Sequence, residues 1–309
     1  MVPESRSLNL YVTPSGKVWG AEARNIPTQL YDCEDAAVAA ISRQSDIHVR
    51  LLGLPQNAAL ISQFSDIVTQ RGDGRVEVAS PLLCDTHHER QNPEIAVGRM
   101  RQCRVAASLG GWHEVTENDR LIYAMVVTSN EQETTSGSDK LMGLFSKHPL
   151  SRYLAFVDTL HEPSAARLLT EIIDPRWYVD RANPSRVSRL QSYLGLTPKN
   201  FEKLVVRKIK PNTPSLRRAA LAYAAWSGTP QLNSPNTSNF VTERSTFAGG
   251  GHIGALRATQ VFICYLARTW QHVIVNAGPV PQDMFLPAEL LHGEHLKAYH
   301  AYEATTRAS

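Results

Sequence analysis

Lysine and arginine, the side chains that bind phosphate, are concentrated in residues 176–218 of the sequence. This window holds 11 basic residues and two acidic ones, so its net charge is +9. Like charges gathered on one compact surface repel one another, and a polyanion relieves that repulsion. Nucleic acid is a common partner of this kind, because neutralising its phosphates releases counterions. The basic residues are Arg176, Arg181, Arg186, Arg189, Lys199, Lys203, Arg207, Lys208, Lys210, Arg217 and Arg218.

Residues 186–210 add a structural pattern to this charge. Apolar residues at helical spacing precede and follow a short turn at 195–197. Gly195 can adopt the positive φ of a turn, and Thr197 can cap a second helix that has Pro198 at its first position. Two short helices joined by such a turn form a helix-turn-helix unit. In DNA-binding versions the second helix enters the major groove.

This pattern predicts which side chains contact nucleic acid. The exposed cations of the second helix can bond guanine or phosphate, and its asparagine can pair with adenine. Two arginines of the first helix are expected to hold the DNA backbone. We therefore expect a regulatory or accessory protein that binds nucleic acid, DNA rather than RNA. The predicted contact residues are Arg186, Arg189, Lys199, Asn200, Lys203, Arg207, Lys208 and Lys210.

The same residues admit other interpretations. The first helix carries Gln191 or Ser192 where DNA-binding versions favour a small residue, and short helix pairs also occur in ordinary bundles. The basic face could instead be solvated, or meet an acidic protein in an assembly, which makes a structural subunit of a complex the alternative function. Trp177, Tyr178 and Tyr193 interleave the cations as in sites that stack single-stranded bases, although core positions are the preferred interpretation.

Other residues that resemble chemical sites carry weaker signals. Cys84, His87 and His88 fall in one short segment, but a zinc site needs about four ligands at workable spacing. The histidines within 292–300 lack the i, i+4 spacing of a helical metal site. The glycines within 249–254 lack the preceding strand and the later acid of a dinucleotide fingerprint. The sequence therefore predicts no catalytic residue, metal or cofactor, and the interpretation leans away from an enzyme.

The elements that must position these residues fall into two parts of the sequence with opposite net charge. Residues 1–139 have a net charge of −6, whereas residues 140–309 have a net charge of +9. Where the sign changes, the segment TSNEQETTSGSD has no aliphatic or aromatic side chain, which is typical of a linker. We predict an acidic α/β domain over 1–128, a polar linker over 129–139 and a basic helical domain over 140–309.

Hydrophobic periodicity predicts the class of each part. The first part should hold strands near 8–12, 17–19, 48–52 and 76–79, and helices near 34–43, 60–68 and 94–108. The second part should be helical near 163–173, 186–208, 215–226, 253–275 and 287–303. The predicted fold class is therefore α+β, with a small N-terminal α/β part followed by a mainly α-helical C-terminal domain.

Composition excludes several classes of protein. Hydrophobic residues make up 42% of the chain and charged residues 20%, which is typical of a globular protein. No apolar run approaches the ~18–20 residues that cross a bilayer. The N-terminus has no basic region followed by an apolar stretch, as a signal peptide would. The four cysteines are widely scattered, whereas a disulfide framework has closely spaced cysteines, so we interpret them as reduced thiols. We therefore expect a soluble cytoplasmic protein.

Overall fold

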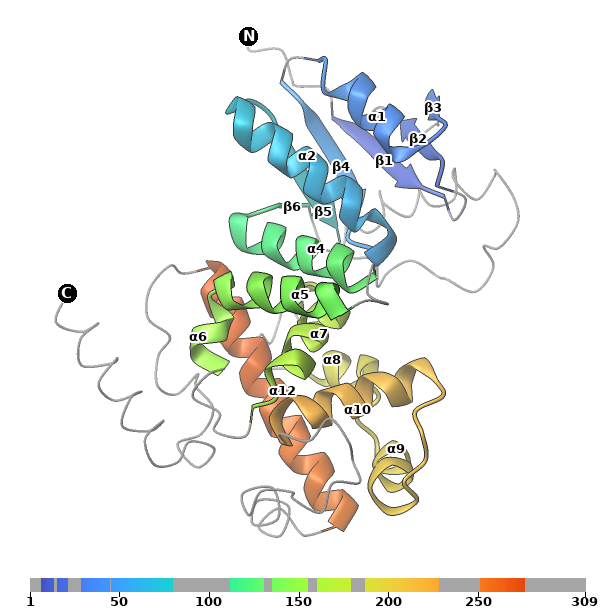
Figure 1. Cartoon of the computed structure of the whole chain (residues 1–309), viewed down its shortest axis with the longest axis vertical. Coiled ribbons are helices and arrows are strands. Elements are labelled where there is room, and N and C mark those ends of the chain that lie inside the picture. The colour runs from blue at the N-terminus through green and yellow to red at the C-terminus, as the bar shows by residue number, and fades with distance from the viewer. Residues whose placement is uncertain are drawn as a thin grey trace, which may run out of the picture. The chain divides into compact units, whose positions relative to one another are not determined.

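The chain folds into two compact units, Met1–Asn130 and Glu131–Ser309, in a computed structural model (Figure 1). The structure describes residues 7–13, 16–21, 29–44, 46–79, 112–130, 135–154, 160–178, 187–227 and 251–275. The described strands all belong to a single sheet in the first unit, and the described elements of the second unit are helices. The predicted α+β class is therefore confirmed.

The sheet of the first unit combines a parallel centre with antiparallel edges. Its strand order is β3-β2-β1-β4-β5-β6, in which β1, β4 and β5 run parallel and the other pairs are antiparallel. The parallel pairing of β4 and β5 requires a crossover, which the helix between them provides. The strands are β1 (Leu8–Val12), β2 (Val18–Ala21), β3 (Gln29–Tyr31), β4 (His48–Leu52), β5 (Arg75–Ala79) and β6 (His113–Glu114).

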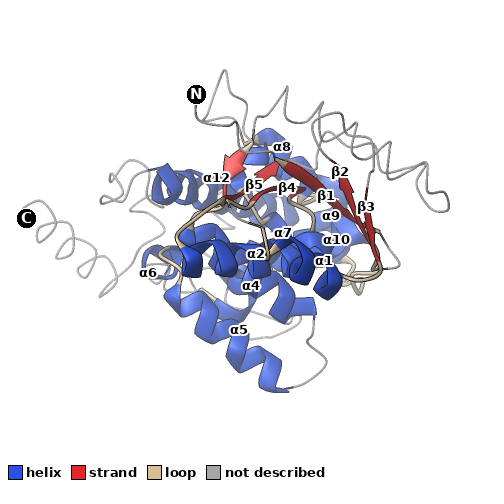
Figure 2. Ribbon diagram, turned by 90° about the horizontal axis from the view of Figure 1, so that it is seen from above, coloured by secondary structure: helices blue, strands red, loops and turns tan. Residues whose placement is uncertain are grey.

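The described helices of the first unit lie on one side of this sheet (Figure 2). They are α1 (Glu34–Ile41), the 3-10 turn η1 (Pro55–Asn57), α2 (Ala58–Arg71) and α4 (Glu117–Asn130). α2 packs against both β5 and α4, and its buried residues include Leu60 and Phe64. After α2, Gly74 has a φ of +88°, and a Cβ there would lie 2.2 Å from the carbonyl oxygen of Ile47. Glycine is therefore required where the chain turns into β5.

The second unit is a cluster of helices around α12. Its core includes Trp226, whose indole nitrogen donates to Thr259 Oγ1 at 2.9 Å and thereby joins α10 to α12. Both Trp226 and Trp270 are almost fully buried. The described elements are α5 (Thr135–Lys147), α6 (Leu150–Leu154), α7 (Glu162–Ile172), η3 (Pro175–Tyr178), α8 (Ser188–Tyr193), α9 (Pro198–Phe201), η4 (Glu202–Val206), α10 (Pro214–Ser227) and α12 (Gly251–Val275).

The described residues of the predicted linker at 129–139 are helical rather than loop, and the boundary between the two units falls within this segment, after Asn130. α4 continues to Asn130, and α5 already begins at Thr135. α5 is anchored by Leu141 and Phe145, which are four residues apart and both buried. Their packing extends the helix back through a polar stretch, because tertiary contacts override weak local propensity. The helices predicted at 94–108 and 287–303 lie outside the described residues.

Candidate nucleic-acid interface

The turn between α8 and α9 is held by its glycine and its threonine. Gly195 has a φ of +69°, and a Cβ there would lie 2.6 Å from the carbonyl oxygen of Ser215. The hydroxyl of Thr197 accepts from the backbone N–H of Asn200 at 3.3 Å, and Pro198 occupies the first helical position. The chain therefore turns where the sequence predicted, with the predicted cap.

Buried apolar residues and two amide side chains fix this turn on α12. Gln191 donates to the carbonyl of Gln260 at 3.3 Å, and Gln260 donates to the carbonyl of Leu196 at 3.4 Å. α12 also packs against α9 and η4. The side chains of Phe201 and Leu204 are fully buried. The opposite side of the α8–η4 segment is thereby left to the charged residues.

The second helix of this segment ends earlier than the sequence predicted. It runs as α9 through Phe201 and then widens into a π-helix, in which Arg207 N–H bonds the carbonyl of Glu202 at 3.0 Å. Lys208 then adopts a left-handed backbone with φ 51°, and Ile209 N–H caps the carbonyl of Lys203 at 2.9 Å. Arg207 and Lys208 therefore lie beyond the helix, which corrects their expected place on it.

The predicted contact residues differ in their surroundings. Five of them are exposed cations, namely Arg189, Lys199, Arg207, Lys208 and Lys210. Lys203 is half-exposed, and Arg186 lies outside the described residues. The amide of Asn200 donates to the carbonyl of Gly195 at 2.8 Å, so the turn itself uses the group that was expected to pair with adenine.

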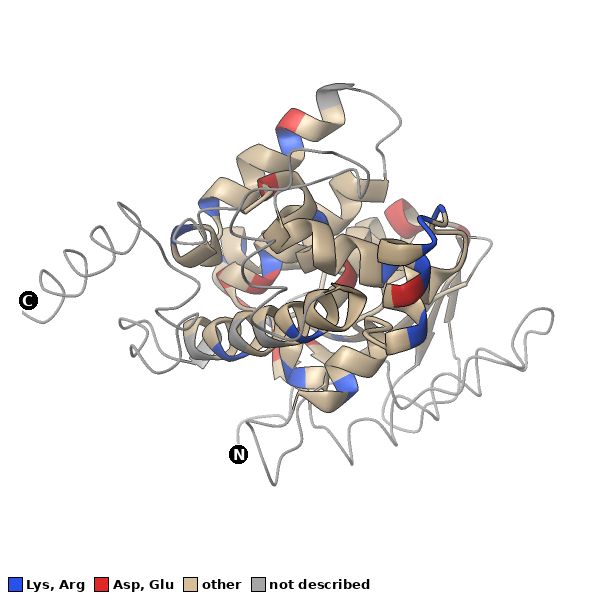
Figure 3. Ribbon diagram, turned by 90° about the horizontal axis from the view of Figure 1, so that it is seen from below, with Lys and Arg blue, Asp and Glu red and all other residues tan. Residues whose placement is uncertain are grey.

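The exposed cations are densest in residues 206–210, which we call the basic tip (Figure 3). Arg207, Lys208 and Lys210 all extend from it into solvent. Arg207 also pairs with Glu202 at 2.6 Å, but its side chain is 60% exposed. An exposed ion pair of this kind contributes little to stability, so its guanidinium can exchange the carboxylate for another anion at small cost.

Two other cations of the window, Arg176 and Arg218, are partly buried and bonded to groups within the unit. Arg176 pairs with Asp174 at 2.7 Å, and the side chain of Asp174 is 3% exposed. Arg218 donates to the carbonyl of Tyr193 and stacks 4.2 Å above the centre of its ring. Tyr178 is buried against Tyr193, with ring centres 4.9 Å apart. These aromatic rings are therefore packing residues, and they are not displayed as a platform for bases.

Sequence reasoning missed two apolar residues of the basic tip. Val206 is 58% exposed and Ile209 is 37% exposed. Among the described residues, Leu30 is the one other large apolar side chain with such exposure. The signal is the mixture of apolar and basic residues in VRKIK, all five of which are exposed.

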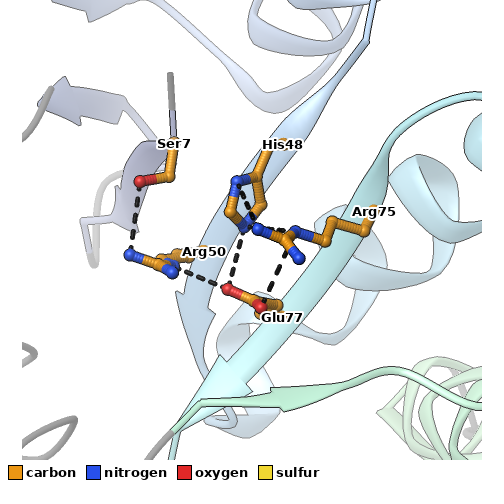
Figure 4. A network of polar contacts seen from close by, with 5 residues as sticks. All are labelled: Ser7, His48, Arg50, Arg75 and Glu77. Atoms are coloured by element: carbon orange, nitrogen blue, oxygen red, sulfur yellow. Dashed lines mark hydrogen bonds and ion pairs between the residues drawn. The ribbon is translucent and has the colours of Figure 1, made fainter. Parts of the chain in front are cut away.

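A second charged cluster lies on the sheet of the first unit (Figure 4). The register of β4 and β5 pairs His48 with Arg75 and Arg50 with Glu77, which places all four on one face. Glu77 Oε2 accepts from Arg50 Nε at 2.6 Å and lies 2.8 Å from His48 Nε2. Arg75 Nε lies 3.0 Å from the same ring nitrogen, and Arg50 donates to the hydroxyl of Ser7 at 3.2 Å.

The carboxylate of Glu77 is the centre of that cluster. Its side chain is 13% exposed, and that of His48 is 2% exposed. Burial raises the pKa of Glu77, but hydrogen bonds and charge from Arg50 and His48 outweigh burial and hold this pKa below its usual range. The cluster thus ties β4 to β5 through a charged group, and we assign it a structural role.

Most of the remaining candidate site residues lie outside the described part of the chain. Within those ranges, no group of three or more His, Cys, Asp or Glu is placed to hold a metal ion. Cys84, His87, His88 and the histidines of 292–300 lie outside the described residues. Among the described helices, none is both long enough and apolar enough to span a bilayer. The chain matches no protein-family model, no curated protein and no solved structure.

Proposed function

We propose that this protein binds nucleic acid, DNA in particular, through the α8–η4 segment and the basic tip. The observation that carries the proposal is the run of exposed cations at Arg207, Lys208 and Lys210, on a surface whose reverse side is packed on α12. Lys199 and Arg189 extend the same exposed charge along α9 and α8. Such a surface suits a regulatory or accessory role, in which the rest of the chain is free to contact other components.

The geometry favours contacts to phosphate over direct reading of bases. Lysines on an exposed turn act as mobile point charges, whereas the planar fork of Arg207 can bond two phosphate oxygens at once. Asn200 is engaged with Gly195, and the helical part of the segment is short. We therefore expect affinity that depends strongly on salt and weakly on base sequence.

The alternative function is a structural subunit whose basic face meets an acidic protein. The exposure of Val206 and Ile209 favours it, because a phosphate backbone offers no apolar surface to cover them. A protein partner with acidic and apolar residues would cover both. This partner would compete with nucleic acid for the same cations.

Salt dependence tests the proposal directly. Fluorescence anisotropy of a labelled 20-base-pair duplex should show affinity falling by about 10²- to 10³-fold between 50 and 200 mM salt, as expected for about five phosphate contacts. The same titration with single-stranded DNA and with RNA compares the three nucleic acids. The absence of binding to all three at 50 mM salt would contradict the proposed function.

Two double variants, each of which removes two positive charges, test the site. Lys208→Gln with Lys210→Gln should lower the slope of log affinity against log salt by about two and weaken duplex binding uniformly across sequences. The matched control is Lys147→Gln with Arg152→Gln, which removes two exposed cations from α5 and α6 of the same unit. If the control weakens binding as much as the tip variant does, the attraction is diffuse and the assigned site is wrong.

A further inference from the structure

The basic tip carries more apolar surface than phosphate contact uses. Val206 and Ile209 stand between and beside three exposed cations, within a stretch of five residues. Contacts to phosphate neutralise the charge but leave both aliphatic side chains in water. A ligand that covers the whole tip must therefore present negative charge and an apolar surface within a few ångströms of each other.

The backbone holds the two aliphatic side chains outward rather than letting them fold back on the unit. The bonds from Arg207 N–H to Glu202 O and from Ile209 N–H to Lys203 O close the end of η4, at 3.0 and 2.9 Å. Between them Lys208 has a φ of 51°, which a lysine adopts only against a steric cost. Burial of the tip does not offset this steric cost, because residues 206–210 are all exposed.

We propose that Val206 and Ile209 contact unstacked bases, so that the site prefers DNA with an accessible base face over intact duplex. This inference rests on the proposed nucleic-acid function and names its substrate class. A bulged or single-stranded segment presents flat apolar bases beside its phosphates, whereas a regular duplex hides them in the stack. Aliphatic wedges set among cations are also how proteins engage weakened base steps in duplex DNA.

Electrostatics alone predicts the opposite preference, which makes the inference testable. Duplex DNA has the higher charge density and releases more counterions per contact than a single strand does. The probes are a 20-base-pair duplex, the same duplex with a central two-nucleotide bulge, and the single strand. We expect the bulged duplex and the single strand to bind at least about fivefold more tightly than the intact duplex, from the burial of aliphatic area against bases.

The variant that tests the contact is Val206→Ser with Ile209→Ser, which changes no charge. It should remove the preference for the bulged duplex and the single strand, while affinity for intact duplex and its salt slope stay unchanged. Leu30→Ser is the matched control, because Leu30 is an exposed apolar residue of the first unit at 42% exposure. Circular dichroism and the urea midpoint verify that the variants are folded.

The outcomes separate this inference from the proposed function. Equal affinity for all three probes, or a preference that survives the Val206→Ser and Ile209→Ser changes, overturns the base contact and leaves nucleic-acid binding in place. Absence of binding to every probe at 50 mM salt overturns both. Loss of the preference in the tip variant, with the Leu30→Ser protein behaving as the parent protein does, supports the inference.

Discussion

At the scale of single residues, Lys208 affects the stability of the fold through its backbone and the charge of the surface through its side chain. Its backbone has a φ of 51°, where a residue with a side chain pays about 1–2 kcal/mol and glycine does not. Its ammonium is exposed at the basic tip. The same residue therefore carries a cost for folding and, under the proposed function, a benefit for binding.

We expect Lys208→Gly to leave the free energy of unfolding unchanged or to raise it by up to about 1 kcal/mol, because relief of strain exceeds the added freedom of the unfolded chain. Binding to duplex DNA should weaken, with the salt slope lower by about one. Urea denaturation and anisotropy at several salt concentrations measure the two effects. A clear loss of stability would show that the lysine side chain supports the turn.

We expect Glu77 to make the stability of the sheet sensitive to acid. Its folded-state pKa is depressed, so its contribution to stability is complete above the unfolded-state pKa of about 4.3 and is lost as the pH falls through the lower folded-state value. We expect Glu77→Gln to cost about 1.5–3 kcal/mol at pH 7, as hydrogen bonds to a charged group do. The loss of stability on acidification below pH ~5 should also become shallower.

Urea denaturation at pH 7, 5 and 4 measures both effects of Glu77→Gln. Asp46→Asn is a suitable control, since Asp46 is an exposed acid at the start of the same strand region. If Glu77→Gln and the parent protein lose stability with the same steepness below pH ~5, another carboxylate dominates the acid response.

At the scale of elements, the turn between α8 and α9 depends on one glycine. Gly195→Ala places a Cβ 2.6 Å from a carbonyl oxygen at a φ of +69°, so we expect a loss of at least about 2 kcal/mol. Gly143→Ala is the control within α5, where a Cβ meets no atom within 4 Å. That change should stabilise the protein by up to about 1 kcal/mol. Thermal denaturation of both variants tests the turn, and equal effects would contradict it.

Elements with strong local signals could be predicted from the sequence, and those set by long-range contacts could not. The strand at 8–12 was predicted by alternation and a strand was also expected at 48–52, and both form at those residues. The π-turn of η4 has no local signal, because it depends on how Phe201 and Leu204 are buried against α12. The Glu77 cluster was missed for the same reason, since it needs the register between β4 and β5.

At the scale of the whole molecule, each unit has a core of its own. Phe64 is fully buried in the first unit, and Phe201 is fully buried in the second. We expect Phe64→Ala to destabilise by about 3–5 kcal/mol and to raise hydrogen exchange mainly within residues 1–130. Phe201→Ala should do the same within residues 131–309. Exchange that rises equally in both units for either variant would show one cooperative fold.

The net charge of the window at 176–218 overstates the charge of its surface. Arg176 is held by a nearly buried aspartate, and Arg218 is stacked on a tyrosine, so both serve the fold. A count along the sequence cannot separate these from Lys208 or Lys210, because burial depends on partners distant in the chain. The window in the sequence nevertheless contains the segment in which the exposed cations of the described residues are densest.

The π-helix of η4 sets the direction in which the basic tip faces. A π-turn accommodates one residue more than an α-turn does, and each residue of an α-helix advances the chain by about 100° about its axis. Removing one residue between Glu202 and Val206 would restore α-helical pitch and rotate everything that follows by that angle. Deleting a single residue of η4 would thus change the direction in which the tip faces, without altering the composition of the tip itself.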